Sequence, residues 1–394
     1  MAKQDYIPQV PYGTKDILPL DAARKRQVEN ELARLFLAWG YQEVVTPTFE
    51  YYETLKAGAP EESDDSSFRF FDRNGRMLAL RPDMTTPIAR VAVMRMKENP
   101  LPLRLFYLAN VFRQEESQAG RQCEFYQAGV ELLGAGGIAA DAEVVALAVE
   151  ALIAGGLSDF QVCLGQVDFI GGIMADAGLS SIERQNIKRF LLERNMVGLT
   201  ELLTQCQIDP DIKQLLQQLP MLHGKMDMLQ QVRGRVKNKI SQAALDNLAE
   251  IYGLLQNYGI DRYVTFDLGI IRDFEYYTGM VFEAYTTGLG YPICGGGRYD
   301  RMAAAFGREQ PATGFALGIE RVLMALDRQG TGVTQLSQAI YVGWANGQIP
   351  LAIAEVRRLR LAGELVELAL QPQDKATAEL EAKRRGSRSV VYVG

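Results

Sequence analysis

The feature that most constrains the fold is a long helical segment inside a strand-rich sequence. Residues 104–133 alternate like two strands around the polar loop ESQAGRQ. From about 175 to 260 the apolar spacing becomes helical, and Ser180 with Glu183 forms a candidate capping box at its start. Strand-like sequence resumes at YVTFDLGI. This order predicts an α+β fold in which a helical insertion interrupts a sheet domain.

The N-terminal region predicts a helix and a hairpin. Residues 21–39 have one apolar stripe, which predicts an amphipathic helix with Asp21 as its cap and Gly40 at its end. The segment FRFFDRNGRMLAL predicts a hairpin, because Asn-Gly between two alternating runs favours a tight turn.

The C-terminal region has a different pattern. Residues 331–394 begin with the linker-like stretch TGVTQLSQ and then alternate strand and helix, which predicts a small α/β domain. We therefore predict a core over residues 1–330, with the insertion at about 175–260, and a separate C-terminal domain over residues 331–394.

Composition argues against several classes of function. The formal net charge is -6 and the pI is about 5.2, which argues against a broad nucleic-acid-binding surface. No apolar run is long enough to predict a transmembrane helix, and MAKQDYIPQV lacks the apolar core of a signal peptide. The four cysteines are scattered, so we expect neither a zinc site nor a disulfide framework, and a reducing, cytoplasmic location.

The only histidine, His223, limits the available chemistry. Catalytic triads, histidine-rich metal sites and histidine acid–base catalysis would all need this residue. It lies in QLPMLHGKMD, between two helical stretches, where a surface or packing role is the more common one. The sequence therefore argues against histidine-based catalysis in this chain.

The segment FYQAGVELLG is a candidate ligand-facing strand. Alternation along a strand places Gln127, Gly129 and Glu131 on one face and the apolar residues on the other. An amide and a carboxylate on either side of a glycine would leave room for a ligand over the strand, which favours a pocket protein for a small zwitterionic ligand of amino-acid size. The alternative is a solvated outer face, which is common in antiparallel sheets.

Two further segments combine arginine with carboxylate side chains. VFRQEE places Arg113 and Glu115 at strand spacing, where the arginine could hold a carboxylate or phosphate, or could form only a surface ion pair. LALRPDMTTPIAR places Asp83, Thr85 and Thr86 in a rigid turn between prolines. Asp83 could bind an ammonium group or could only cap the following helix.

Three segments near the end of the core are rich in glycine, tyrosine and arginine. IIRDFEYYTGMVFEAY carries Arg272, Tyr276 and Tyr277, and the two tyrosines could line a pocket or could simply pack. YPICGGGRYDRM has three consecutive glycines, which permit close backbone approach, but it lacks the P-loop pattern. TGFALGIERVLMAL places Arg321 in the first turn of a predicted helix.

In their order along the chain these segments resemble the catalytic core of a class II aminoacyl-tRNA synthetase of the histidyl type. VFRQEE is similar to the second class motif, GFALGIERV to the third, and IRDFEYYTGMVFE and GGGRYD to the two signatures of histidyl enzymes. PYGTKDILP is similar to the usual lead-in, so the resemblance covers about residues 8–328. It implies a class II synthetase-like antiparallel sheet flanked by helices, and a homodimer made through the first-motif helix.

The resemblance also implies a histidine pocket. Glu131 and Tyr276 would face the imidazole, Asp83 the ammonium group and Arg272 the carboxylate, while Arg113 and Arg321 match the arginines that hold ATP phosphates in the synthetases. The candidate histidine-binding residues are Asp83, Thr85, Arg113, Gln127, Glu131, Arg272, Tyr276 and Tyr277. We expect no catalytic residue, no metal ligand and no cofactor.

Several departures from the synthetase pattern indicate a different role. Met84 stands where the synthetase sequence LRPEGT has a glycine, and it would add bulk where close approach is needed. Cys123 replaces a basic residue, and Asp273 beside Arg272 would weaken the attraction of phosphate. The C-terminal domain is also shorter than the anticodon-binding domain of that family.

These departures, above all LRPDMTTPIAR, are similar to those of the synthetase paralogues that serve as regulatory subunits of ATP phosphoribosyltransferase. That resemblance implies a non-catalytic chain that binds histidine and activates a short catalytic subunit in the first step of histidine biosynthesis. It also implies a homodimer within a larger hetero-oligomer, without membrane association or tRNA binding. The competing hypotheses are a working histidyl-tRNA synthetase, because Arg113 and Arg321 are retained, and a free-standing histidine-binding protein.

Overall fold

The computed structural model describes residues 9–58, 67–114, 122–193, 195–270, 276–332 and 338–394. The chain forms two compact units, Met1–Gly332 and Val333–Gly394. Among the residues that the sequence singles out, Glu115, Arg272 and Asp273 lie outside the described ranges.

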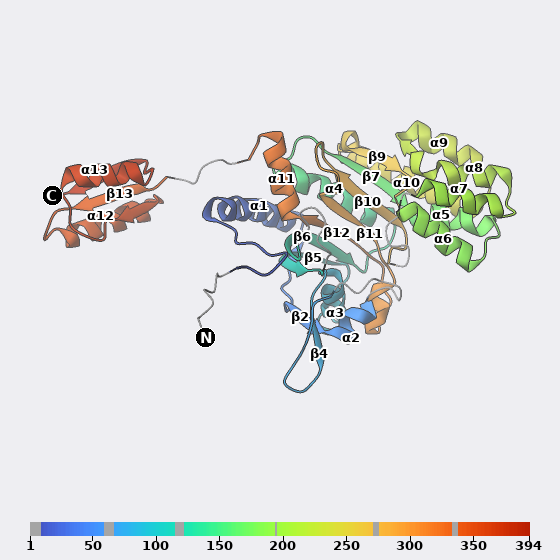
Figure 1. The fold of residues 1–394 in the computed structure, drawn as a ribbon, viewed down its shortest axis with the longest axis horizontal. Coiled ribbons are helices and arrows are strands. Elements are labelled where there is room, and N and C mark those ends of the chain that lie inside the picture. Colours follow the sequence, from blue (N-terminus) through green and yellow to red (C-terminus); the bar gives the residue numbers. More distant parts are fainter. Residues whose placement is uncertain (1–8, 59–66, 115–121, 194, 271–275, 333–337) are drawn as a thin grey trace, which may run out of the picture. The chain divides into compact units, whose positions relative to one another are not determined.

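The larger unit is built on a nine-stranded sheet with the strand order β1-β5-β6-β12-β11-β10-β7-β9-β8 (Figure 1). Pairing is antiparallel except between β1 and β5 and between β7 and β9. The predicted antiparallel sheet is therefore confirmed, with parallel pairs only toward its two ends. The strands are β1 (Gln42–Glu43), β5 (Leu103–Phe112), β6 (Glu124–Leu133), β7 (Gln161–Gln166), β8 (His223–Gly224), β9 (Val264–Asp267), β10 (Met280–Tyr285), β11 (Cys294–Arg298) and β12 (Ala312–Gly318).

Helices α1 (Pro19–Ala38), α4 (Ile138–Ala154) and α11 (Ile319–Gln329) cover one face of this sheet. The predicted helix at 21–39 is confirmed as α1, because its apolar stripe is buried against the sheet and α4. Its predicted cap is wrong: Leu18 occupies the N-cap position and Pro19 starts the helix, so Asp21 lies in the first turn instead. Gly40 follows the helix end with a φ of 80°, as predicted.

A second, three-stranded sheet has the order β2-β4-β3, with β2 (Phe49–Tyr51), β3 (Arg69–Phe71) and β4 (Met77–Leu80). The predicted hairpin is confirmed, since β3 and β4 pair antiparallel around a turn in which Gly75 has a φ of 77°. The short helix α2 (Tyr52–Gly58) and helix α3 (Thr85–Arg95) pack nearby, together with the 3-10 segment η3 (Met302–Phe306).

The helical insertion is confirmed between β7 and β9. It comprises α5 (Val167–Asp176), α6 (Ser181–Leu192), α7 (Met196–Gln205), α8 (Pro210–Gln218), α9 (Met226–Arg235) and α10 (Lys239–Asn257), with the 3-10 segments η1 (Leu219–Met221) and η2 (Asp261–Tyr263). The predicted capping box is present: the Glu183 N–H donates to Ser180 Oγ at 3.3 Å, and the Ser180 N–H donates to Glu183 Oε2 at 2.7 Å.

The smaller unit is a parallel three-stranded sheet with the order β14-β13-β15. Its elements are β13 (Ile340–Trp344), α12 (Ile349–Leu361), β14 (Val366–Leu368), α13 (Lys375–Arg384) and β15 (Ser389–Val393). Helix α12 packs on β13 and β14, while α13 packs on β13 and β15, with β13 between the two helices in Figure 1. The predicted alternation of strand and helix is confirmed. Within the described ranges, no helix combines the length and the apolar character that crossing a membrane requires.

Candidate functional site

The centre of the candidate site is the carboxyl group of Glu131 on β6, which is only 2% exposed. Its Oε2 accepts a hydrogen bond from the phenol of Tyr299, and the Thr85 hydroxyl is also hydrogen-bonded to this carboxyl group. Burial raises the pKa of Glu131 to about 8, although both hydrogen bonds lower it. Glu131 is therefore mostly protonated at neutral pH.

Two glycines make close packing around Glu131 possible. Gly314 on β12 is paired directly with Glu131, and a Cβ atom at position 314 would collide with Glu131 Oε2. A Cβ atom at Gly129 would likewise collide with the phenol of Tyr107. The space above Gly129, which the sequence attributed to a ligand, is thus filled by Tyr107.

The two faces of β6 differ as the alternation predicted. Ala128, Val130 and Leu132 belong to the main hydrophobic core, whereas Glu131 is buried on the opposite face. The alternative of a solvated outer face is therefore wrong. On the same face as Glu131, the side-chain oxygen of Gln127 is buried and has no hydrogen-bond partner within the protein. Buried acceptors are seldom left unsatisfied, so this oxygen is suited to a donor on a ligand.

Tyrosine rings form a wall beside Glu131. The ring centroids of Tyr276 and Tyr299 are 5.6 Å apart, and Tyr276 is hydrogen-bonded to Thr85. Burial raises the pKa of both phenols well above the ordinary value, so both remain protonated donors. Tyr277 packs instead beside Gly297 and a small cluster that contains Val281. Of the two adjacent tyrosines, Tyr276 thus lies beside Glu131.

Asp83 and Arg113 lie at the edge of this group. Asp83 Oδ1 accepts a hydrogen bond from the Thr86 N–H at 3.3 Å, which supports the helix-cap alternative. The negative charge of Asp83 also raises the pKa of Glu131, so the carboxylate is close enough to act on the site. Arg113 Nε donates to the carbonyl of Pro82 at 2.9 Å and thereby holds the turn that carries Asp83.

Two residues that depart from the synthetase pattern, Met84 and Cys123, are buried in the structure. Met84 is 1% exposed and is buried with Ile88 and Tyr107, so its bulk lies in the core rather than in the ligand space where we expected it. Cys123 is also buried, and its N–H donates to the carbonyl of Gly13 at 2.7 Å. Cys123 therefore packs against the N-terminal lead-in segment instead of facing a phosphate.

Two other candidates lie apart from the Glu131 carboxyl group. Arg321 Nη1 donates to the carbonyl of Pro292 at 2.5 Å, and its guanidinium lies 5.0 Å from the ring centroid of Tyr291. His223 is exposed on β8, the last strand in the sheet order, which agrees with a surface role. Across the described ranges, no three or more histidine, cysteine, aspartate or glutamate side chains come together as a metal site would require.

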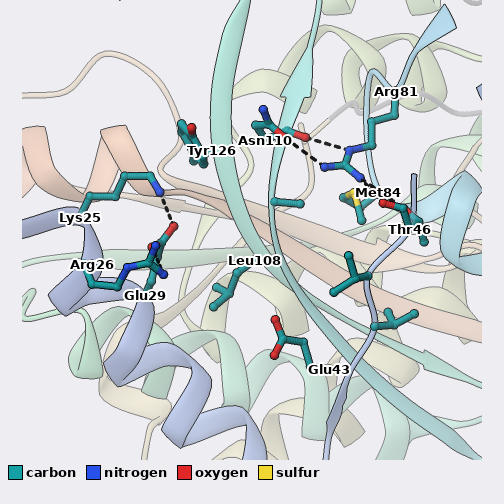
Figure 2. Close-up of a pocket in the computed structure, with 13 residues that line it drawn as sticks. Lys25, Arg26, Glu29, Glu43, Thr46, Arg81, Met84, Leu108, Asn110 and Tyr126 are labelled. Carbon is teal, nitrogen blue, oxygen red and sulfur yellow. Dashed lines mark hydrogen bonds and ion pairs between the residues drawn. The ribbon is translucent and has the colours of Figure 1, made fainter. Parts of the chain in front are cut away.

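A cavity of about 340 Å³ lies between α1 and the β1 edge of the sheet (Figure 2). Arg81 lines it, and this guanidinium donates to the carbonyls of Asn110 at 2.9 Å and Thr46 at 2.8 Å. Met84, which lies between Asp83 and the start of α3 at Thr85, also lines this cavity. The cavity is lined by Lys25, Arg26, Glu29, Glu43, Val44, Val45, Thr46, Arg81, Met84, Leu108, Ala109, Asn110 and Tyr126.

Comparison with known proteins places this arrangement in a family. A family model described as histidyl-tRNA synthetase matches residues 13–322. A protein from Moorella thermoacetica named ATP phosphoribosyltransferase regulatory subunit is 43% identical over 378 residues, which is 96% of each chain. The chain belongs to the ATP phosphoribosyltransferase regulatory subunit family.

Other members of this family agree with the assignment. A regulatory subunit from Desulforamulus reducens is 42% identical over 96% of this chain and 94% of its own. A crystal structure from Bacillus halodurans, described as an ATP phosphoribosyltransferase regulatory subunit/histidyl-tRNA synthetase, superposes with a TM-score of 0.88 at 35% identity and covers 98% of both chains. Histidyl-tRNA synthetase from Nostoc superposes with a TM-score of 0.83 at 21% identity, which shows the shared fold alone.

These comparisons confirm the predicted regulatory-subunit resemblance and the class II synthetase-like fold. The relatives' name links the family to histidine biosynthesis and suggests a non-catalytic chain. Sequence reasoning missed two residues at the site, Tyr107 and Tyr299. The only sequence signal for Tyr299 was its place two residues after the three-glycine run, in GGGRYD.

Proposed function

We propose that this chain is a non-catalytic regulatory subunit that binds histidine and activates a short catalytic ATP phosphoribosyltransferase subunit. In this role it contributes histidine feedback to the first step of histidine biosynthesis. The observation that supports the proposal best is the buried Glu131 carboxyl group beside Tyr276, in a chain whose relatives are named regulatory subunits. A protonatable carboxyl group in a tyrosine-lined site suits an imidazole, which can donate or accept a proton.

The ionisation of Glu131 determines how an imidazole would be held. With a pKa of about 8, protonated Glu131 can donate to a neutral imidazole nitrogen. If the proton moves to the imidazole instead, the carboxylate accepts a hydrogen bond from the imidazolium. In both arrangements the proton shared by Glu131 and the imidazole is the one that Glu131 carries before binding. Binding of a neutral imidazole at neutral pH therefore needs no net proton uptake.

The remaining candidates would hold the two charged ends of the amino acid. The unpartnered oxygen of Gln127 and the carboxylate of Asp83 suit the ammonium group. Arg272, which the resemblance assigns to the ligand carboxylate, stays a prediction. Thr85 would act through its bonds to Glu131 and Tyr276, while Arg113 would hold the Asp83 turn. Tyr277 would support the wall from its packed position beside Gly297.

Regulation requires that histidine binds two states of the complex with different affinities.

We also propose a homodimer through α1 and the adjoining end strand β1, as the resemblance implies. Val45, which follows β1, is 84% exposed, and Leu37 on α1 is 59% exposed, so this edge presents apolar side chains that a second copy would cover.

Calorimetric titration of the full chain with L-histidine, alongside histidine-dependent ATP–pyrophosphate exchange, tests the proposal. We expect saturable histidine binding without exchange, and activation of a short catalytic subunit when the two chains are mixed. Exchange at an ordinary synthetase rate with no effect on the transferase would favour the histidyl-tRNA synthetase alternative. Histidine binding with neither effect would favour a free-standing histidine-binding protein.

A further inference from the structure

A buried ion-pair network lies behind the candidate site, on the face of the sheet that α4 covers. Arg298 at the end of β11 is 7% exposed, and Asp141 in the first turn of α4 is 3% exposed. Arg298 Nη2 and Nε donate to the two carboxylate oxygens of Asp141 at 2.7 and 3.2 Å. A two-point contact of this kind fixes the orientation of the guanidinium as well as its position.

The same network holds the neighbouring backbone. Arg298 Nη1 donates to Asp300 Oδ1 at 3.0 Å, and Nη2 donates to the carbonyl of Gly137 at 3.4 Å. Asp300 Oδ1 also accepts from the Ala312 N–H at 2.9 Å, while the Asp300 N–H donates to Thr278 Oγ1 at 2.9 Å. Residues 298–300 are thus tied to the start of α4, the start of β12 and the segment before β10.

Tyr299 lies between Arg298 and Asp300, and its side chain points to the opposite face of the sheet, because side chains alternate along a strand. Its N–H donates to the carbonyl of Ala312 at 2.8 Å, which continues the pairing of β11 with β12. Its phenol donates to Glu131. The place of this phenol is therefore set by the backbone that the network holds on the other face.

We propose that Arg298, held by Asp141, is a positioning residue for the histidine pocket. It fixes residues 298–300 so that the Tyr299 phenol meets Glu131, and it acts through Tyr299 rather than on the ligand. Desolvation largely offsets the attraction within a buried ion pair, so the main effect of this pair is geometric. This inference rests on the proposed histidine binding and adds a residue pair on the other face of the sheet.

The test compares two isosteric substitutions on α4. Asp141→Asn keeps the side-chain volume but removes the charge and one acceptor from Arg298. Glu143→Gln, two residues along the same helix, disrupts a similar two-point contact. There Arg104 on β5 donates from Nε and from Nη2 to the two carboxylate oxygens of Glu143, each at 2.8 Å. In calorimetry, we expect Asp141→Asn to raise the Kd for histidine about tenfold, the scale on which outer-shell partners affect metal sites. Glu143→Gln should change the Kd by less than about twofold.

A double-substitution cycle with Tyr299→Phe separates positioning from a general loss of structure. Because the effect passes through the phenol, Asp141→Asn should change the Kd by less than about twofold in the Tyr299→Phe background. An equal weakening in both backgrounds would overturn the inference, as would an unchanged Kd in Asp141→Asn alone. If circular dichroism shows that Asp141→Asn does not fold, Asp300→Asn replaces it in the same cycle.

Histidine binding by the native chain and coupling in the substitution cycle test the proposed function and the positioning role separately. If the native chain binds histidine and the cycle shows no coupling, only the positioning role is refuted. If the native chain does not bind histidine at all, the proposed function fails and the positioning role fails with it.

Discussion

Replacing Glu131 by glutamine should have opposite effects on stability and on ligand binding. Burial raises the pKa of Glu131 from 4.5 to about 8, so the folded state holds a proton that an exposed carboxyl group would release. At pH 7, which is 2.5 pH units above 4.5, this costs about 3 kcal/mol at 1.36 kcal/mol per pH unit. Glutamine is uncharged and nearly isosteric, so without histidine the variant should be more stable by up to about 3 kcal/mol.

The change of the free energy of unfolding with pH follows from the raised pKa of Glu131. Between pH 4.5 and about 8 the folded state binds more protons than the unfolded state, so the free energy of unfolding falls as pH rises through this window. The stability advantage of Glu131→Gln should therefore grow from pH 5 to pH 8 and level off above it. Histidine binding should weaken by about 1–3 kcal/mol, the scale for losing one charge-assisted partner.

Denaturant unfolding at several pH values and calorimetry with histidine measure the two effects on the same samples. Glu143→Gln is the matched control, because it removes a carboxylate that is ion-paired with Arg104 outside the site. The control should lose stability and keep its histidine affinity. If Glu131→Gln were less stable than the native chain at pH 8 and bound histidine equally well, both the buried-carboxyl argument and the pocket would be refuted.

Three further predictions concern the site and its surroundings. Histidine affinity should be highest between about pH 6.5 and pH 8, because Glu131 and the imidazole together hold one proton there; calorimetry showing a monotonic pH profile would contradict this. Gly314→Ala should weaken histidine binding more than about tenfold, since the new Cβ atom would collide with Glu131; an unchanged Kd would place the ligand elsewhere. Ser180→Ala should lower the free energy of unfolding by about 1 kcal/mol in denaturant titrations and leave histidine affinity unchanged, because it removes only a helix cap.

Local patterns made much of the fold predictable. The alternation that separates Glu131 from Val130, and the tight turn around Gly75, both depend on residues close together in the chain. The cap of α1 was mispredicted because Pro19 starts the helix before Asp21, where an acidic residue also suits the first turn.

Long-range packing explains what the sequence did not predict. Tyr299, directly after β11, contacts Glu131 across 168 residues of sequence, and Arg298 contacts Asp141 across 157 residues. Neither contact follows from spacing, because each depends on the register of strands that pair only in the folded chain. The side-chain direction of Met84 was missed for the same reason, since it is set by packing beneath α3.

The most direct test of a histidine-responsive regulatory subunit is the rate of phosphoribosyl transfer by a short catalytic subunit from the same organism. The rate is measured for that subunit alone, with this chain, and with this chain and histidine. We predict a rise when this chain is added and a fall when histidine follows, with the fall weakened in Glu131→Gln. A transfer rate that this chain leaves unchanged, with both proteins folded and in equal amounts, would contradict the proposed role.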